Sequence, residues 1–425
     1  MRYLLFLILT VQFTHVKGQG IVRHLPYKID TIVFEGLNVT QEDWLRTFIQ
    51  CKEGAPFSPE IYERDLQNIR NINLFFSVKG EWRVSGGQVA ITIKIREAKY
   101  VYPYVYVGGF KEAFQVSLGL SNIHWKGKGG TLGIWYRYYD RHSFSAFYRM
   151  PRLTNSSLGY EWAVGKYGTV EPLYFQDQVC LVNYDLFSTS SKLYRWMGLH
   201  QRVEAGLGIF HEVYTALDEH PVAILSHPIK KNKGLISLSY ILDRRDYSYE
   251  MVEGNFLELS SEYVYTLEEP QFPFAAGQVT WKNYKKLGGK WNSAFRLRLS
   301  YGTNRYSPFL PYVIDGFANV RGSGNRIARG TAMALFNFEL RRRVYQNRYG
   351  IVQLVTFSDL AWLRKAGDSI PSWWSAKSNY SYAGFGGRVL LQRFYHIVLR
   401  LDYSRAIHTN GGAKGGLVFG IGQFY

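Results

Sequence analysis

Apolar and polar residues alternate along the chain from residue 100 to its end. The segment 114–121 (FQVSLGLS) places its large apolar residues at every second position. The segments 295–301 (FRLRLSY) and 397–404 (IVLRLDYS) repeat this pattern with arginine and aspartate between the apolar residues. Strands that are apolar on one side and charged on the other fit a wall with lipid outside and water inside. We therefore predict that residues 100–425 form a transmembrane antiparallel β-barrel of about sixteen strands, so that the chain is mostly β.

One alternative to the barrel is a soluble β-sandwich, in which the apolar faces would form a core. The region is long for that fold, because β-sandwiches rarely exceed ~250 residues. The pattern does not assign strand registers between 152 and 290, where the loop lengths are ambiguous.

Residues 28–98 have a different pattern, which predicts a small α+β domain of the order β-α-α-β-β. Its first and last strands are expected in IDTIVFEG and VAITIKIRE, and its second strand in NLFFSVKGEW. The first helix is expected to begin at a capping box of Thr40 and Asp43 and to end at Gly54. The second is expected to begin at the N-cap Ser58 with Pro59 in its first turn, and to carry an apolar stripe of Tyr62, Leu66 and Ile69.

The first eighteen residues have the pattern of an export signal. A positive start at Arg2 precedes the apolar run Leu4–Leu9 and a small-residue cleavage site that ends at Gly18. The run is too short to span a bilayer as a helix, although an uncleaved anchor is the alternative. Gln19 follows the expected cut, which argues against a lipoprotein.

The composition supports an exported barrel. The chain has 33 Tyr, 27 Phe, 11 Trp and 41 Gly, which suits many strands with aromatic girdles at the membrane interfaces. A formal charge of +18 favours anionic partners, and export makes nucleic acid the least suitable of them. Cys51 and Cys180 fall in different predicted domains, so we expect no disulfide framework. His211, Glu212 and His220 lack a recognised ligand spacing, and no metal is expected.

Several motifs resemble a known family. The segment 28–98 resembles a POTRA domain, the periplasmic module that precedes certain outer-membrane barrels. The segment 122–130 (NIHWKGKGG) resembles the short turn after the second barrel strand of the BamA/TamA superfamily of outer-membrane assembly and translocation proteins, the bacterial surface antigen family. FYRMPRL resembles the end of its fourth strand, and GGLVFGIGQFY, which closes on Tyr425, resembles its last strand. The resemblance covers the mature chain and implies a member with a single POTRA domain.

The stretch DGFANVRGSGNRIARG resembles loop six of this superfamily, which folds back into the barrel. The resemblance implies a loop motif of Val320, Arg321 and Gly322, with Arg321 paired to an acidic residue of the lumen wall. Asp359 is the best acidic match, and Glu339 also faces the lumen by alternation. The motif usually continues with an aromatic residue where this chain has Ser323, which weakens the expected packing of the loop tip.

The sequence also allows this loop to be compared with a phosphate-binding loop and with an ordinary extracellular loop. A phosphate-binding loop requires a lysine and a following helix that the sequence lacks, whereas an ordinary extracellular loop stays open.

The resemblance also implies a seam where the first and last barrel strands meet. Pro103 in the first strand has no N–H, and Gly420 and Gly422 soften the last strand before Tyr425. These residues suit a seam that opens, although Pro103 could instead simply lie at the strand start, in the linker from the POTRA domain.

Taken with the resemblance, these features predict a protein of the outer membrane with its POTRA domain in the periplasm. It would bind unfolded outer-membrane or secreted polypeptides through the POTRA domain and insert or translocate them by way of the seam and lumen. Outer-membrane lipid and possible accessory lipoproteins complete its partners, and no cofactor is expected. The alternative is a passive outer-membrane channel or a pore like those of two-partner secretion. An enzyme is not expected, since the G-x-S-x-G and H-E-x-x-H motifs are absent.

Overall fold

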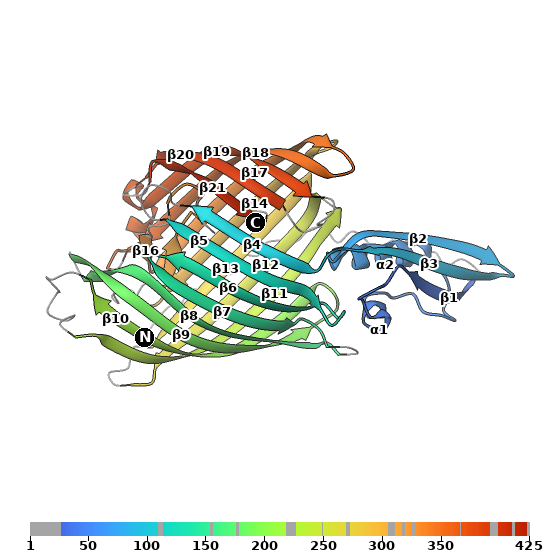
Figure 1. Ribbon diagram of the computed structural model, residues 1–425, viewed down its shortest axis with the longest axis horizontal. Helices are drawn as coiled ribbons and strands as arrows, with labels where there is room; N and C mark the ends of the chain where they lie inside the picture. The colour runs from blue at the N-terminus through green and yellow to red at the C-terminus, as the bar shows by residue number, and fades with distance from the viewer. Residues whose placement is uncertain are drawn as a thin grey trace.

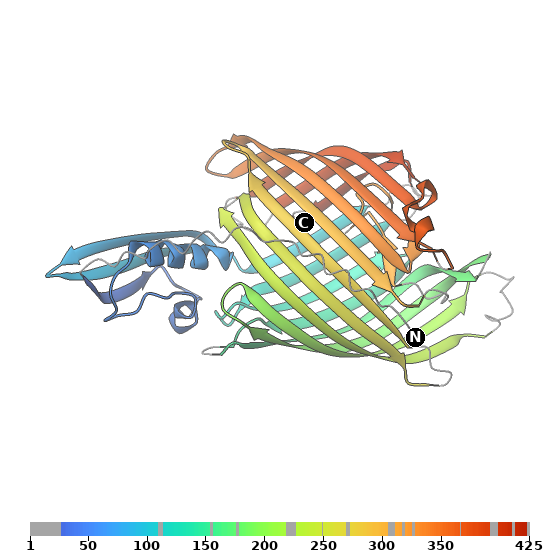
Figure 2. The ribbon, with the colours of Figure 1, turned by 180° about the vertical axis from the view of Figure 1, so that it is seen from behind.

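The protein consists of a β-barrel with a small domain at one end (Figures 1 and 2). The computed structural model describes residues 27–108, 114–153, 156–175, 178–217, 227–248, 250–268, 273–304, 311–316, 319–324, 328–365, 367–391, 398–409 and 413–422. The predicted export signal at 1–18 and Tyr425 lie outside these residues. Across the described part of the chain, no helix has the length and apolar character needed to cross a membrane.

The small domain has the predicted element order, with two helices packed on a three-stranded sheet. Its elements are β1 (Lys28–Glu35), α1 (Glu42–Arg46), α2 (Pro59–Asn71), β2 (Phe75–Ser85) and β3 (Gln88–Glu97). The sheet order is β1-β3-β2, with β1 parallel and β2 antiparallel to β3. The period of two in β3 is confirmed, and its buried side chains pack with the stripe of α2; this core includes Val89, Ile91, Ile93, Ile95, Tyr62, Leu66 and Ile69.

The start of α2 confirms one predicted cap, whereas α1 contradicts the other. The Ser58 hydroxyl accepts a hydrogen bond from the Ile61 N–H, and Pro59 occupies the first helical position. Helix α1 begins after Gln41 without a side-chain cap and ends at Arg46, well short of Gly54. The predicted capping box of Thr40 and Asp43 is therefore wrong.

Strand β1 departs from simple alternation. Its pairing with β3 shifts between Ile29 and Thr31, which is a β-bulge. As a result both Ile29 and Ile32 are buried, although an uninterrupted strand would place them on opposite faces.

The barrel is a closed ring in which the described residues form sixteen strands, as predicted. They are β4 (Val101–Gly108), β5 (Gln115–Trp125), β6 (Gly130–Tyr139), β7 (Arg141–Met150), β8 (Leu158–Phe175), β9 (Gln178–Trp196), β10 (Gln201–Ala216), β11 (Ile229–Ser248), β12 (Met251–Thr266), β13 (Phe274–Lys286), β14 (Trp291–Gly302), β17 (Ala332–Gln346), β18 (Gly350–Arg364), β19 (Asn379–Leu391), β20 (Val398–His408) and β21 (Gly415–Ile421). These sixteen strands close into one ring and do not form two facing sheets, so the sandwich alternative is wrong. The structure supplies the registers that the sequence left open, in strands β8 to β13.

Side chains of the barrel wall alternate as expected for lipid outside and a polar lumen. Leu118, Leu299 and Leu401 are exposed on the outer face. Arg296 and Asp402 on the inner face are 3% and 1% exposed. The charged face is thus enclosed and the apolar face is left for lipid.

The connection from β14 to β17 contains a hairpin of β15 (Tyr312–Ile314) and β16 (Ala328–Gly330). Ile314 and Val320 of this connection pack with side chains of the inner wall; this cluster also contains Met333, Leu335, Ala361, Leu363, Tyr380 and Tyr382. The loop therefore lies inside the barrel, and the interpretation as an ordinary extracellular loop is wrong. Two short helices, η2 (Pro371–Trp374) and η3 (Ala376–Ser378), lie between β18 and β19.

Candidate functional site

The loop tip between β15 and β16 is held in a compact turn. The Val320 N–H donates to the Asp315 carbonyl at 2.9 Å, and the Gly316 N–H donates to the Gly324 carbonyl at 2.8 Å. Gly322 has φ of +81°, and a Cβ on it would lie 1.7 Å from Ser404 Oγ on β20. Only glycine fits there, because both the backbone conformation and the close approach to the wall exclude a side chain.

Arg321 binds Asp359 of β18 through three hydrogen bonds. Its Nε and Nη2 donate to the two carboxylate oxygens, each at 2.9 Å, and its backbone N–H donates at 3.0 Å. Arginine and carboxylate geometries match in this two-pronged arrangement, which makes the pair directional as well as strong. Both side chains are 0% exposed.

The same guanidinium also reaches Glu339 of β17, with Nη1 2.5 Å from Oε2. Glu339 in turn accepts from Arg341 at 2.6 Å and lies 3.6 Å from Arg388. Arg388 also donates to Asp402 on β20 at 2.6 Å. The loop arginine is therefore one member of a buried network in which acids and arginines alternate.

The structure brings together the loop motif and both acidic residues that the sequence singled out, and it adds residues that the sequence analysis did not connect to them. Phe357 places its ring 3.5 Å from the Arg321 guanidinium carbon. Asn337 donates to Asp359 at 2.7 Å. Alternation along β17 and β18 puts Phe357 and Asn337 on the lumen side, but their meeting depends on strand registers that the sequence does not give.

Ser323 occupies the position where the resembling family has an aromatic residue. Its hydroxyl donates to the Val320 carbonyl at 2.8 Å, which closes the turn. An aromatic ring does lie against Arg321, but it is Phe357 of the wall rather than a residue of the loop.

The predicted seam joins β21 to β4. In the described residues this pairing consists of Phe419 with Val107 and Gly420 with Tyr106, whereas the adjoining pairs β20–β21 and β4–β5 extend along most of their strands. Gly422 has φ of +109° and donates its N–H to the Val398 carbonyl at 2.7 Å.

Pro103 lies inside β4, where it is paired with Leu120 of β5. Pro103 is the third residue of this strand, which agrees with the alternative that it simply lies at the strand start, although it belongs to the strand and not to the linker from the POTRA domain.

The small domain is fastened to the β5–β6 turn, the segment NIHWKGKGG. The Thr40 hydroxyl and His124 Nε2 are 3.0 Å apart, and His124 Nδ1 accepts from the Gly129 N–H at 3.0 Å. Because Nδ1 accepts, the neutral ring carries its proton on Nε2 and donates it to Thr40. The Gln41 N–H adds a bond to the Gly127 carbonyl at 3.0 Å. These contacts explain why Thr40 does not cap α1.

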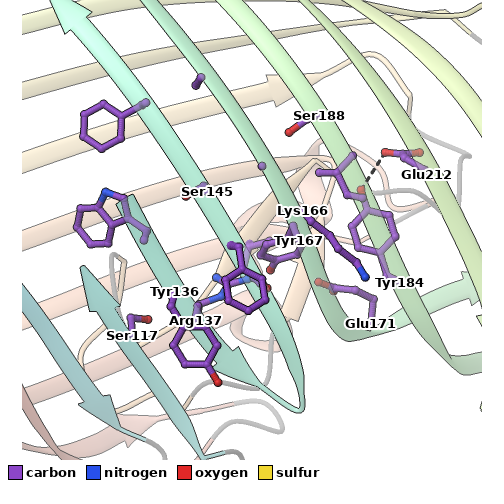
Figure 3. Close-up of a pocket in the computed structure, with 18 of the residues that line it drawn as sticks. Ser117, Tyr136, Arg137, Ser145, Lys166, Tyr167, Glu171, Tyr184, Ser188 and Glu212 are labelled. Carbon is purple, nitrogen blue, oxygen red and sulfur yellow. Dashed lines mark hydrogen bonds between the residues drawn. The ribbon is translucent and has the colours of Figure 1, made fainter. Parts of the chain in front are cut away.

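A cavity of about 1000 Å³ occupies the lumen between the loop hairpin and the wall strands β5 to β11 (Figure 3). The Tyr184 and Tyr214 hydroxyls each donate to Glu212 at 2.9 Å, and Lys233 lies 2.5 Å from the same carboxylate. Glu171 also lines the cavity, where it faces Arg329 of β16.

The candidate metal residues do not converge. His211 and Glu212 are neighbours on β10 and therefore face opposite sides of the wall. His220 lies outside the described residues. Among the residues that the structure places, no group of three or more His, Cys, Asp or Glu side chains is arranged to hold a metal ion.

Solved structures of BamA and CdiB have a fold similar to that of this chain. BamA from Haemophilus ducreyi lacking POTRA domains 1–3 superposes with a TM-score of 0.55 at 16% identity, over 93% of this chain and 84% of that one. CdiB from Escherichia coli superposes with a TM-score of 0.61 at 13% identity, over 93% and 76% of the two chains. CdiB from Acinetobacter baumannii gives 0.57 at 14% identity, over 93% and 73%. No curated protein matches the chain in sequence.

Two family models match the chain. Residues 27–98 match the POTRA family, described as a surface antigen variable number repeat. Residues 103–425 match the Omp85 superfamily domain, which covers most of the sequence. The chain therefore belongs to the Omp85 superfamily of outer-membrane β-barrel proteins and carries a POTRA domain ahead of its barrel.

Proposed function

We propose that this protein inserts polypeptides into the outer membrane or translocates them across it. Residues 28–98 form the client-binding POTRA domain in the periplasm, and residues 100–425 form the barrel, in contact with outer-membrane lipid. No bond is made or broken, so the barrel needs no catalytic residue. The observation that carries the proposal is that, among the described residues, β4 and β21 pair at two positions, whereas β20 and β21 pair at seven and β4 and β5 at eight.

Client binding at the POTRA domain follows from the edges of its sheet. The outer edge of β1 is covered, because the segment 53–57 bonds to it, including Gly54 N–H to the Ile29 carbonyl at 2.7 Å. The outer edge of β2 is the open one, and Trp82 and Val84 near its end are exposed. An extended client segment can add there as a strand through main-chain hydrogen bonds, which require little sequence specificity.

The seam provides the route into lipid. Within the described part of the seam, β21 and β4 pair at two positions, so their separation breaks fewer backbone hydrogen bonds than separation of β20 from β21 or of β4 from β5. Pro103 has no N–H to donate within β4, and Gly420 lacks a side chain on β21. The Arg321 network lies beside this region, since its members Asp402 and Ser404 are on β20, the neighbour of β21. The loop can therefore hold the wall in shape while the seam parts.

The decisive experiment locks the seam with a disulfide. Cysteines at Val107 and Phe419 face each other across it, and a control pair at Leu401 and Phe419 links β20 to β21 instead. We expect the seam lock to lower the level of folded outer-membrane proteins or of secreted proteins in cells, and a reductant to restore it. The control pair should be active in both conditions. Full activity of the oxidised seam lock would count against the proposal.

Photocrosslinking tests the POTRA edge separately. A photoreactive residue at Arg83 on the open β2 edge should capture client chains, while one at the exposed Lys52 beside the covered β1 edge should not. Equal capture at both positions would show that the open edge is not the binding site.

A passive channel is the second candidate, because the lumen holds a large cavity and several buried arginines. Steady anion-selective conductance, with no change in any envelope or secreted protein after deletion, would favour it.

A further inference from the structure

The loop hairpin is attached to the barrel at a second point, away from Arg321. Arg329 of β16 donates from Nε and Nη2 to the two carboxylate oxygens of Glu171 on β8, each at 2.7 Å. The Glu171 side chain is 4% exposed. This is again a two-pronged pair, the geometry that distinguishes arginine from lysine.

The two attachments lie on opposite walls. In the ring of strands, β8 stands across the barrel from β17 and β18, which hold Glu339 and Asp359. The hairpin therefore spans the lumen from one wall to the other. A loop bound at Arg321 alone could still swing toward its own wall, whereas a loop bound at both ends cannot.

The hairpin also forms one boundary of the lumen cavity. Val313, paired with Arg329 in the hairpin, lines the cavity together with Glu171. Figure 3 shows Glu171 on the cavity wall with Tyr184 and Glu212 nearby. The acid Glu212 is already bound by two tyrosines and Lys233, so Glu171 is the cavity carboxylate that the hairpin arginine uses.

We propose that the Arg329–Glu171 pair is a latch that keeps the loop hairpin across the lumen, and that its release opens the lumen while Arg321 still holds the loop tip. The latch acts by positioning the hairpin. In the narrow lumen the pair is screened less than at a free surface, so it is stable until one partner loses its charge or an anionic group displaces Glu171. The proposal concerns the lumen alone and holds whichever polypeptide uses the barrel.

The test is the conductance of the purified full-length protein in planar lipid bilayers. Glu171→Gln and Arg329→Gln should each raise the ratio of open to closed states by about tenfold or more, which corresponds to ~1.4 kcal/mol. The swapped double variant Glu171→Arg/Arg329→Glu should return toward the closed behaviour of the wild type. Arg329→Lys keeps the charge but loses the fork, and should be intermediate.

The matched control is Glu161→Gln. Glu161 lies on the same strand and faces the lumen, but its partners Arg149 and Tyr194 belong to the neighbouring wall strands β7 and β9. It should leave the conductance unchanged, and heat-modifiable migration on gels should show that every variant is folded. Wild-type conductance in folded Glu171→Gln, or a swapped variant as open as the single variants, would overturn the latch. Neither result would bear on the seam, which the disulfide experiment tests.

Discussion

At the scale of single residues, removal of Arg321 affects its two acidic partners differently. Glu339 would keep contacts with Arg341 and Arg388. Asp359 would keep the hydrogen bonds from the Asn337 amide and from the backbone N–H of residue 321 but lose the guanidinium. A buried carboxylate without its cation raises the free energy of the folded state, so most of the destabilisation should come from Asp359.

We therefore expect Arg321→Ala to lower the free energy of unfolding by about 3–5 kcal/mol, the range for breaking one partner out of a buried ion pair. Adding Asp359→Asn should recover part of this loss, because the orphaned charge is removed. Adding Glu339→Gln should recover none. Urea unfolding of the detergent-solubilised protein measures the free energy of unfolding of Arg321→Ala and of both double variants. Equal recovery by both second substitutions would show that the destabilisation does not arise mainly at Asp359.

Glu97 supplies a pH-dependent contact inside the POTRA domain. Burial opposes ionisation of this carboxylate, but hydrogen bonds from Thr40 and from the Val39 N–H outweigh it, so the pKa of Glu97 lies below its usual range. A lowered pKa in the folded state means that the ionised form stabilises the domain. This stabilisation is complete above the unfolded-state pKa of about 4.3 and disappears as the pH falls through the lower folded-state pKa.

The expected result is stronger protection of the Val39 and Thr40 amides from hydrogen exchange in the wild type than in Glu97→Gln at pH 7. The ratio should be about fivefold to tenfold, since a partly solvated charged hydrogen bond contributes roughly 1 kcal/mol. Exchange measured on the intact protein should show this ratio approach one below pH 4. A ratio that stays constant with pH would mean that the charge of Glu97 is not involved.

At the scale of elements, the β5–β6 turn requires glycine at positions 127 and 129. Gly127 and Gly129 both have φ of +69°. A Cβ on Gly127 would lie 2.0 Å from the Val39 carbonyl oxygen, and one on Gly129 would lie 2.6 Å from the Trp44 ring. The turn is thus shaped to receive the POTRA domain as well as to connect two strands.

Gly127→Ala should loosen the POTRA domain from this turn. The matched control is Gly198→Ala in the β9–β10 turn, where φ is +78° but nothing lies within 4 Å of an added Cβ. Tyr100, now buried against His124, should become accessible to chymotrypsin in Gly127→Ala, with cleavage accelerated by roughly tenfold if about 1.4 kcal/mol of docking is lost. Similarly accelerated cleavage in Gly198→Ala would show that backbone strain, and not lost contact with the POTRA domain, causes the effect.

The elements that the sequence predicted correctly are those whose signal is local. The alternation in 114–121, the stripe of α2 and its Ser58 cap depend on residues within a few positions of one another. The interpretation failed at Thr40 and in β1, where partners far along the chain decide the conformation: the Thr40 hydroxyl meets His124, and pairing with β3 places the bulge.

The residues of the candidate site also fall into two groups, those that local sequence features predicted and those that they did not. Arg321, Asp359 and Glu339 follow from a motif and from alternation, which the sequence displays. Arg388 meets Glu339 across the intervening strand β18, which depends on strand registers. The pair Arg329–Glu171 joins the loop to the opposite wall, which depends on the closed ring and on how the loop folds within it. No local pattern in a single sequence contains that information.

At the scale of the whole molecule, the described residues of the POTRA domain form hydrogen bonds to the barrel rim at two separated turns, and Arg152 of the β7–β8 turn lies over the Phe48 ring between them. One is the β5–β6 turn with His124. The other joins α2 to the β11–β12 end, where the Asn71 amide donates to Asp246 at 2.9 Å and accepts from the Tyr247 N–H at 3.2 Å. In the ring these turns are separated by strands β7 to β10, so the domain bridges part of the rim instead of pivoting on one point.

Together, the contacts at these two turns should restrain the POTRA domain more than either contact does alone. Distances between spin labels on the POTRA domain and on the barrel can measure this restraint. Labels at Arg83 on the POTRA sheet and Lys290 in the β13–β14 turn are both exposed. The native thiols need no replacement: Cys180 is buried, and burial, with a contribution from Asp65, raises the pKa of the Cys51 thiol to about 12. Only the introduced cysteines therefore react near neutral pH.

The wild type should give a narrow distance distribution. Thr40→Ala removes the contact with His124 but keeps the bond from Gln41 to Gly127, and Asn71→Ala removes the bonds to Asp246 and Tyr247. Each should broaden the distribution modestly, because the remaining contacts still limit the motion. The double variant should broaden it by more than the two single effects together, as is typical of coupled restraints. Additive broadening would mean that the two contacts act independently, and an unchanged double variant would show that packing of the Trp44 and Tyr100 rings around His124 suffices to hold the POTRA domain on the barrel.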